Sequence, residues 1–421
     1  MRQAPFARGA GHVAGRRVVL LGLTASMLSA CVGGGAGPAV SRSSVQAVPN
    51  PAFVAWVAAF QPRAAAQGIS GDTVDRAFRN VGYLPDVIEK DRNQTEFTRT
   101  LEDYLAIAAS DERVGKGRAA LRRQANTLAA IEARYGVDAE IVTAIWGLES
   151  KYGERRGDIP VISSLSTLAF DGRRGAFFEQ QLIASLKILQ RGDTSPERLT
   201  GSWAGAMGHT QFIPTSYLAY AVDFTGDGRR DIWSDDPADA LASTAAYLQR
   251  SGWRTGQPWG MEVRLPPGFN TGLAGRGNAR AASAWAAMGV TDINGRPLPN
   301  HGTAAILMPQ GPRGPAFATF RNFNVILRYN NAEKYGIGVG HLSDRIAGKP
   351  PLQAGFPPDA QGMTIDDRKE LQRRLTARGF DTQGSDGVIG TNTVEAIRAY
   401  QASAGLPVTG EPSLDLLRRL R

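Results

Sequence analysis

Apolar residues recur at helical spacing through most of this 421-residue chain. The pattern predicts a helix over residues 118–135, with Gly136 at a position suited to end it. A second helix is expected from Ala139 to about Tyr152, with Asp138 as its capping residue. Its apolar positions form one stripe: Ile141, Val142, Ile145 and Leu148.

Further helices fit residues 176–190 and 237–250. Between Pro258 and Pro312 the pattern weakens into Gly, Pro and Asn turns, with short extended pieces such as Met261 to Leu265. The fold class expected is therefore mainly α with a minor strand component (α+β).

The N-terminus has the pattern of an export signal. Two arginines at positions 16 and 17 precede an apolar run over residues 18–28, which is too short for a permanent membrane span. The run ends Leu-Ser-Ala-Cys, which resembles the lipobox of bacterial lipoproteins, with Cys31 as the acylated residue. Val32 follows, where an Asp is associated with inner-membrane retention, so the resemblance implies the outer membrane. A twin-arginine signal, or an incidental cysteine in a cleaved signal, is the alternative.

Composition divides the rest of the chain. Residues 1–30 are predicted to be a signal peptide and 31–50 a flexible Gly/Ser/Pro/Ala-rich tether, in which Cys31, the one cysteine of the chain, carries the lipid. Residues 51–347 are expected to form a large globular region, and prolines and glycines mark a linker over 348–362. Residues 363–421 form a small module.

The acidic residue Glu149 ends the apolar stripe of the second helix, eight positions after Ile141. A carboxyl group there is either paired or desolvated, and desolvation raises its pKa toward that of a general acid for glycosidic cleavage. Geometry alone favours the paired, silent alternative.

Four further segments stand in a fixed order: IWGLESKYG at 145–153, STLAF at 166–170 with Arg173 and Arg174 after it, AGAMGHTQFIPTSY at 204–217, and RYN at 328–330 ahead of Tyr335. Together they resemble the membrane-bound lytic murein transglycosylase B family, glycoside hydrolase family 103. The resemblance covers roughly residues 51–347 and implies a lysozyme-like catalytic domain with Glu149 as its catalytic residue.

The resemblance also implies roles for other residues. Two arginines, Arg173 and Arg174, would bind the muramyl carboxyl or peptide groups, and Ser202 and Gln211 would hydrogen-bond the sugars. Three tyrosines would stack on or bond to the saccharide: Tyr247, Tyr329 and Tyr335. The alternative for each residue is a structural role, in which the tyrosines lie in the core and the arginine pair lies on a solvated face.

The implied reaction is a non-hydrolytic cut of the MurNAc-GlcNAc β-1,4 bond that gives 1,6-anhydromuramyl products. Only one acid lies within the matched catalytic motif, whereas most glycosidases use two. Glu154 and Asp158 lie close by and keep a hydrolytic muramidase open as an alternative; a non-catalytic wall-binding lipoprotein is the other.

The segment DFTGDGRRD over 223–231 has the oxygen spacing and turn glycine of a calcium loop. Its twelfth position is Ser234, where a bidentate acid is expected. The chemistry requires no cofactor, so a calcium ion here would be structural. An Asp/Gly turn closed by its own side chains is the alternative. The predicted ligands are Asp223, Thr225, Asp227, the Arg229 carbonyl and Asp231.

The C-terminal module resembles the small three-helix peptidoglycan-binding domain fused to wall hydrolases, on motifs such as DGVIG at 386–390. Its expected core comprises Leu371, Leu375, Val394, Ile397, Leu416 and Leu417. The chain's net charge is +9, and four arginines without acids in residues 1–30 leave +5 for the rest. This mild excess, free of basic runs, argues against nucleic acid and suits an anionic polymer.

The partners expected are therefore peptidoglycan glycan strands and, through the lipid anchor, a membrane; other cell-wall enzymes are further candidates. The location expected is the periplasm, at the outer membrane.

Overall fold

The computed structural model describes residues 45–93 and 99–421. The predicted signal peptide, the lipidated Cys31 and most of the tether lie outside the described residues. Within the described ranges, no helix combines the length and hydropathy that a membrane span requires.

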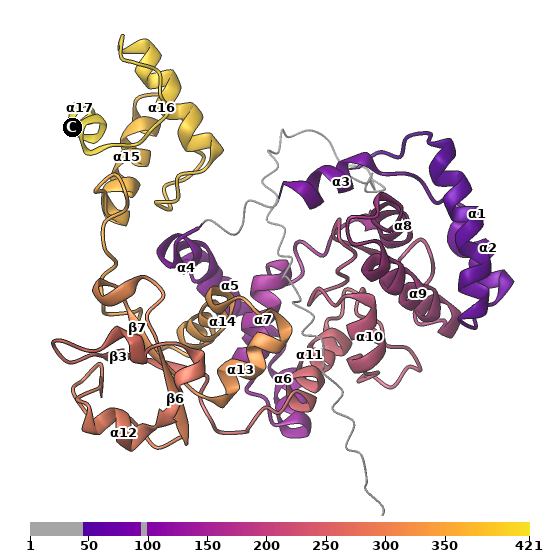
Figure 1. Cartoon of the computed structure of the whole chain (residues 1–421), viewed down its shortest axis with the longest axis horizontal. Coiled ribbons are helices and arrows are strands. Elements are labelled where there is room, and N and C mark those ends of the chain that lie inside the picture. The colour runs from indigo at the N-terminus through magenta and orange to yellow at the C-terminus, as the bar shows by residue number, and fades with distance from the viewer. Residues whose placement is uncertain (1–44, 94–98) are drawn as a thin grey trace, which may run out of the picture.

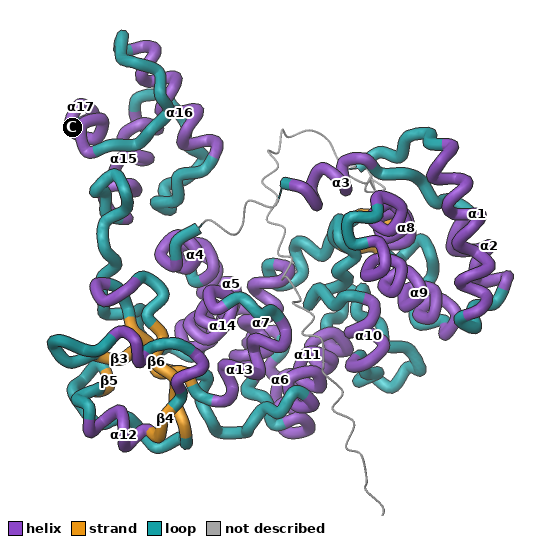
Figure 2. Tube along the Cα trace, in the orientation of Figure 1, coloured by secondary structure: helices purple, strands orange, loops and turns teal. Residues whose placement is uncertain are grey.

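Helices make up most of the described chain (Figures 1 and 2). They form one large hydrophobic core that extends from α1 to α14. The helices of this part are α1 (Pro51–Ala66), α2 (Gly71–Phe78), α3 (Pro85–Arg92), α4 (Leu101–Ala108), α5 (Asp111–Arg123), α6 (Ala125–Tyr135), α7 (Ala139–Ser150), α8 (Val161–Asp171), α9 (Gly175–Arg191), α10 (Pro214–Tyr220), α11 (Ala238–Arg250), α13 (Arg321–Tyr329) and α14 (Glu333–Ile346).

The single helix expected over residues 118–135 is wrong: the structure has two helices, α5 and α6, with a break at Gln124. The Gln124 amide closes the end of α5 by donating to the carbonyls of Ala120 and Arg122. Both helices pack on α7, but α5 also packs on α14 whereas α6 also packs on α11. Gly136 ends α6 in the left-handed conformation, as expected.

Helix α7 lies in the centre of this core. Its residues from Ile141 to Leu148 are all buried, and α5, α6, α11 and α14 pack around it. The helix ends at Ser150 rather than Tyr152. Asp138 occupies the cap position as predicted, but its side chain makes no capping hydrogen bond; Glu132 accepts from the Ala139 amide instead.

The strands form a small antiparallel sheet beside the helical core, in the order β4-β6-β7-β3-β5 (Figure 2). Together with α12 (Ala282–Ala287) it encloses a second core that includes Trp285 and Phe320. The strands are β3 (Gly260–Arg264), β4 (Arg280–Ala281), β5 (Thr291–Asp292), β6 (Thr303–Leu307) and β7 (Ala316–Thr319); β1 (Ile159–Pro160) pairs separately with β2 (Thr200–Gly201). The expected extended piece at 261–265 is β3, shifted by one residue.

Three helices form the C-terminal module: α15 (Ile365–Ala377), α16 (Thr391–Ser403) and α17 (Leu414–Leu420). The expected core residues are buried together, except Val394, which is only partly buried. Arg368 of α15 joins this module to α4 through Glu102 at 2.7 Å and Asp103 at 3.0 Å, and it is only 4% exposed.

Candidate functional site

Glu149 lies at the end of α7, where the helix emerges from the core. It is half-buried, whereas the eight residues before it are buried. Tyr335, in the first turn of α14, donates its hydroxyl to Oε1 of Glu149 at 2.7 Å. The packing of α14 against α7 brings these residues together across 186 positions of sequence.

Tyr335 stays protonated in this setting. It is 1% exposed, and burial together with the negative charge of Glu149 raises the pKa of the Tyr335 phenol well above its ordinary value. The phenol therefore keeps its proton near neutral pH and donates it to Oε1 of the Glu149 carboxyl group.

The backbone after Glu149 turns sharply. Lys151 and Tyr152 have φ of 50° and 61°, and Gly153 follows at 90°. Non-glycine residues in this region cost of order 1 kcal/mol each and persist where surrounding contacts fix them. Here the Tyr152 hydroxyl donates to the Arg113 carbonyl at 2.8 Å. The turn that follows Glu149 is thus held by the packed interior.

Gln211 lies on the loop that faces this turn, and its own φ is 55°. Its Nε2 donates to the carbonyls of Arg156 and Gly208, both at 2.9 Å. The Ser150 hydroxyl donates to the carbonyl of His209 at 2.6 Å, which ties the loop to the end of α7. The segment that carries Gln211 is therefore hydrogen-bonded to the end of α7, where Glu149 lies.

Two of the predicted saccharide-binding tyrosines have their hydroxyls committed to backbone. Tyr247 donates to the Arg328 carbonyl at 2.5 Å, and Tyr329 donates to the Thr210 carbonyl at 2.6 Å. Their rings lie 5.0 Å apart, and the pKa of Tyr329 is raised by burial and by the charge of Glu149. Tyr329 therefore lies close enough to Glu149 for the two groups to interact electrostatically.

Arg173 and Arg174 converge on Asp91 of α3, which is 1% exposed. Both contacts are 2.6 Å long, and Arg173 remains about half exposed. The pair thus anchors α3 to the turn between α8 and α9. The exposed side of Arg173 is the part left to meet a ligand.

Ser202 lies in a tight turn, where its hydroxyl accepts from the Ala206 amide at 3.1 Å.

Glu154, one candidate for a second carboxylate, is exposed and pairs with Lys116 of α5 at 2.9 Å. That ion pair directs the Glu154 carboxylate toward α5.

The predicted calcium loop has a different third carboxylate from the one expected. Oxygen atoms of Asp223, Asp227 and Asp239 lie within 4.8 Å of one another. Asp231 faces elsewhere: its oxygens bond the Trp233 and Ser234 amides and Arg198. Burial raises the pKa of Asp239, and the amides of Phe224 and Thr225 donate to it. Three carboxylates at this spacing fit a hard divalent cation.

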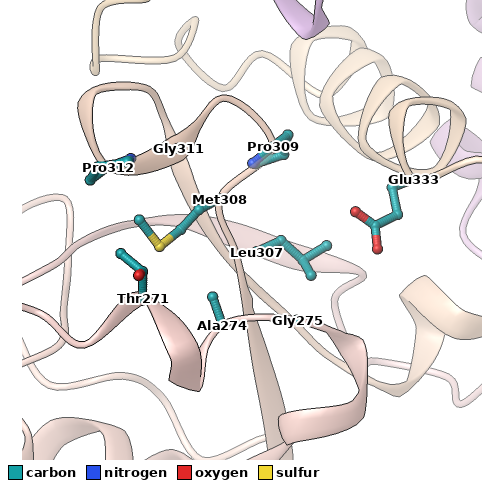
Figure 3. A pocket seen from close by; sticks show the side chains of 9 residues that line it. All are labelled: Thr271, Ala274, Gly275, Leu307, Met308, Pro309, Gly311, Pro312 and Glu333. Atoms are coloured by element: carbon teal, nitrogen blue, oxygen red, sulfur yellow. The ribbon is translucent and has the colours of Figure 1, made fainter.

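A cavity of about 530 Å³ lies beside the first residue of α14 (Figure 3). Its walls are mostly apolar, with Leu307 and Met308 on one side and the Glu333 carboxylate at one end. Glu333 pairs with Arg276 at 3.0 Å. The cavity is lined by the sheet region and the start of α14, not by Glu149 or Gln211.

Three residues that matter here were not singled out from the sequence: Asp91, His209 and Asp239. Asp239 could have been suspected as an acid in the first turn of the expected 237–250 helix. His209 lies within the quoted motif, but a histidine in a motif does not reveal its partner. Nothing in the sequence pairs Asp91 with two arginines 80 positions away.

The sequence matches two family descriptions. Residues 52–344 match the transglycosylase SLT domain, and residues 364–420 match a putative peptidoglycan-binding domain. A curated relative, the membrane-bound lytic murein transglycosylase B of Escherichia coli K12, is 36% identical over 220 residues. That alignment spans 51% of this chain and 58% of the relative's length.

Solved structures agree. SltB3 of Pseudomonas aeruginosa, crystallised with a NAG-NAM-pentapeptide, is 50% identical, with a TM-score of 0.72 over 88% of this chain and all of that one. Slt35 of Escherichia coli, crystallised with calcium, is 29% identical, with a TM-score of 0.60 over 71% of this chain and 93% of that one. The lysozyme-like, mainly helical fold expected from the sequence is confirmed, and the chain belongs to the SLT transglycosylase family.

Proposed function

We propose that this chain is a peptidoglycan lytic transglycosylase, which cuts the MurNAc-GlcNAc β-1,4 bond and leaves a 1,6-anhydromuramyl end. The observation that carries the proposal is the single carboxyl group of Glu149, half-buried at the end of a buried helix and held by Tyr335 at 2.7 Å. The relative SltB3 was crystallised with NAG-anhNAM-pentapeptide, whose anhydro sugar is the product expected here.

In this mechanism Glu149 acts twice. It first protonates the bridging oxygen, and positive charge develops at the muramyl anomeric carbon as the bond breaks. The resulting carboxylate then accepts the proton of the sugar's own C6 hydroxyl, whose oxygen attacks the anomeric carbon and closes the anhydro ring. No water is consumed, and Glu149 returns to its protonated state.

The products test this proposal. Purified sacculi digested with the enzyme are expected to give muropeptides with anhydro ends, each lighter by one water than a muropeptide with a reducing end. Mass spectrometry of the digest measures this difference. A digest dominated by reducing ends would establish the hydrolytic muramidase instead, and an inert enzyme would leave only wall binding.

The C-terminal module supports the same target. Residues 364–420 match a peptidoglycan-binding family, and a binding module joined to a cutting domain raises the local concentration of substrate. A mildly cationic chain also suits an anionic wall polymer. Peptidoglycan strands are therefore the proposed partner of both parts of the chain.

A lipid anchor at Cys31 in the outer membrane, facing the periplasm, is proposed from the lipobox-like sequence and from the membrane-bound name of the Escherichia coli relative. Replacing Cys31 by Ala is expected to move the protein from the membrane fraction to the soluble fraction of a cell lysate. A membrane-bound C31A variant would rule the anchor out.

Calcium is proposed as a structural ion held by Asp223, Asp227 and Asp239, with the neighbouring loop oxygens. Added calcium is expected to raise Tm and chelator to lower it, because a ligand bound only by the folded state stabilises that state. At a concentration 100 times Kd the gain is about 2.7 kcal/mol. An Asp239→Asn variant should lose most of the shift; equal shifts in variant and parent, or none in the parent, would exclude this site.

A further inference from the structure

His209 connects the two segments that carry Glu149 and Gln211. Its side chain is 4% exposed and lies against the last turns of α7. The indole Nε1 of Trp146, one helical turn before Ser150, donates to His209 Nδ1 at 3.1 Å. The rings meet edge to face, with centroids 5.7 Å apart.

The partners of His209 define its protonation. An indole nitrogen only donates, so Nδ1 of His209 accepts and carries no proton. On the other side Nε2 lies 2.7 Å from the carbonyl oxygen of Ser234, which only accepts, so Nε2 carries the proton. The ring is thus neutral, with one tautomer matched at both nitrogens.

Burial favours the same neutral form, because it lowers the pKa of His209. The hydrogen bond to the Ser234 carbonyl raises this pKa, whereas Arg156, whose Nη1 is 3.4 Å from Nε2, opposes a positive charge on the ring. Arg156 is itself fixed by the carbonyls of Trp233 and Ser234 at 2.9 Å and by Asp235 at 2.8 Å. Asp231 and Asp235 act in the opposite direction but do not outweigh burial.

The strained turn after Glu149 is built around this ring. A Cβ atom on Gly153 would lie 2.7 Å from the ring atoms Cε1 and Nδ1, so the turn closes only over a glycine. The Ser150 hydroxyl bridges the two sides: it donates to the His209 carbonyl at 2.6 Å and accepts from the Gly153 amide at 2.9 Å. The ring of His209 therefore packs against Gly153, and its backbone carbonyl accepts from Ser150, so both parts of the residue contact the turn after Glu149.

We propose that His209 is a positioning residue for the catalytic carboxyl: its neutral, Nε2-protonated ring clamps the turn after Glu149 to the loop that carries Gln211. This deepens the proposed function and rests on it. His209 does not touch the reacting atoms; it fixes where the Glu149 carboxyl stands relative to a bound sugar. A misplacement of about 1 Å in such a group lowers turnover by about 100-fold.

Variants at position 209 separate the two hydrogen bonds. His209→Phe keeps a ring against Gly153 and removes both bonds, and we expect kcat to fall by about 10- to 100-fold with KM within about twofold of the parent. His209→Asn places an oxygen near the position of Nδ1, where it accepts from Trp146, and is expected to recover most of the lost kcat. Trp146→Phe removes the donor and should lower kcat as well.

The double variant tests whether these residues act through one bond. If they do, His209→Phe combined with Trp146→Phe lowers kcat about as much as the larger single effect, not by the product of the two. Phe60→Leu, in the buried interior of α1, is the control for lost stability: at an equal drop in Tm it should leave kcat unchanged.

The readout is the rate of anhydro-product formation from soluble glycan strands, with Tm measured on each variant. A parent that gives no anhydro products overturns the proposed function and this proposal with it. An active parent with unchanged kcat in His209→Phe overturns only the positioning role. The positioning role is also overturned if the Asn variant is as slow as the Phe variant, or if Phe60→Leu loses as much kcat as His209→Phe at an equal drop in Tm. Should His209→Phe fail to fold, Trp146→Phe and His209→Asn still decide the question.

Discussion

Replacing Glu149 by Gln is expected to lower the turnover of isolated sacculi by about 10³-fold, the range that a single general acid/base contributes. The amide keeps the size of the side chain and still accepts from Tyr335, so the fold and the Tyr335 contact should persist. It can neither protonate the bridging oxygen nor take the C6 proton. Both halves of the reaction are therefore lost with one group. Product release by mass spectrometry and Tm by calorimetry check the two parts.

The matched control is Glu154→Gln, five residues further along the chain. Its carboxylate is exposed and paired with Lys116, so neutralising it should leave turnover within about twofold of the parent. A Glu149→Gln variant that keeps more than a tenth of the parent rate would remove Glu149 as the catalyst. Strong loss in Glu154→Gln would instead favour the two-carboxylate muramidase.

The apolar stripe predicted a helix that packs in the core, and the structure buries every residue of α7 from Ile141 to Leu148, so the stripe alone did not define the face on which Glu149 lies. The same periodicity missed the break at Gln124. Apolar spacing continues through that residue, although α5 packs on α14 before the break and α6 packs on α11 after it. Periodicity reports which face is buried, whereas a change of packing partner is a tertiary property.

The sequence located the acids of the loop over 223–231 but not their partner. Loop spacing suggested that a residue near position 234 closes the site, whereas the structure brings Asp239 from the first turn of α11. Similarly, Arg173 and Arg174 were expected to bind carboxyl or peptide groups of the substrate, whereas in the structure both form ion pairs with Asp91. Local patterns reveal which residues carry charge, but the partner of a charge comes from a distant segment.

The sequence also could not distinguish the roles of the three tyrosines predicted to bind the saccharide. The resemblance grouped Tyr247, Tyr329 and Tyr335 as saccharide contacts, yet their hydroxyls have different acceptors. Two of them donate to backbone carbonyls, whereas Tyr335 donates to the carboxyl group of Glu149. A phenol at helical spacing fits a core position and a site position equally well, so the sequence could not separate these roles.

Replacing Tyr335 by Phe is accordingly expected to lower kcat by about 10- to 100-fold, since a hydrogen bond to a charged group contributes about 1.5–3 kcal/mol. KM should change little, because the lost bond holds Glu149 and not the sugar; a saccharide-binding role would raise KM instead. The control is Tyr217→Phe in α10, which removes a buried hydroxyl bonded to the Arg230 carbonyl at 2.6 Å, far along the chain from Glu149. Steady-state kinetics on soluble glycan strands distinguish a role in positioning Glu149 from a role in binding the saccharide. Equal kcat losses in Tyr335→Phe and Tyr217→Phe would mean that the Tyr335 hydroxyl serves stability alone.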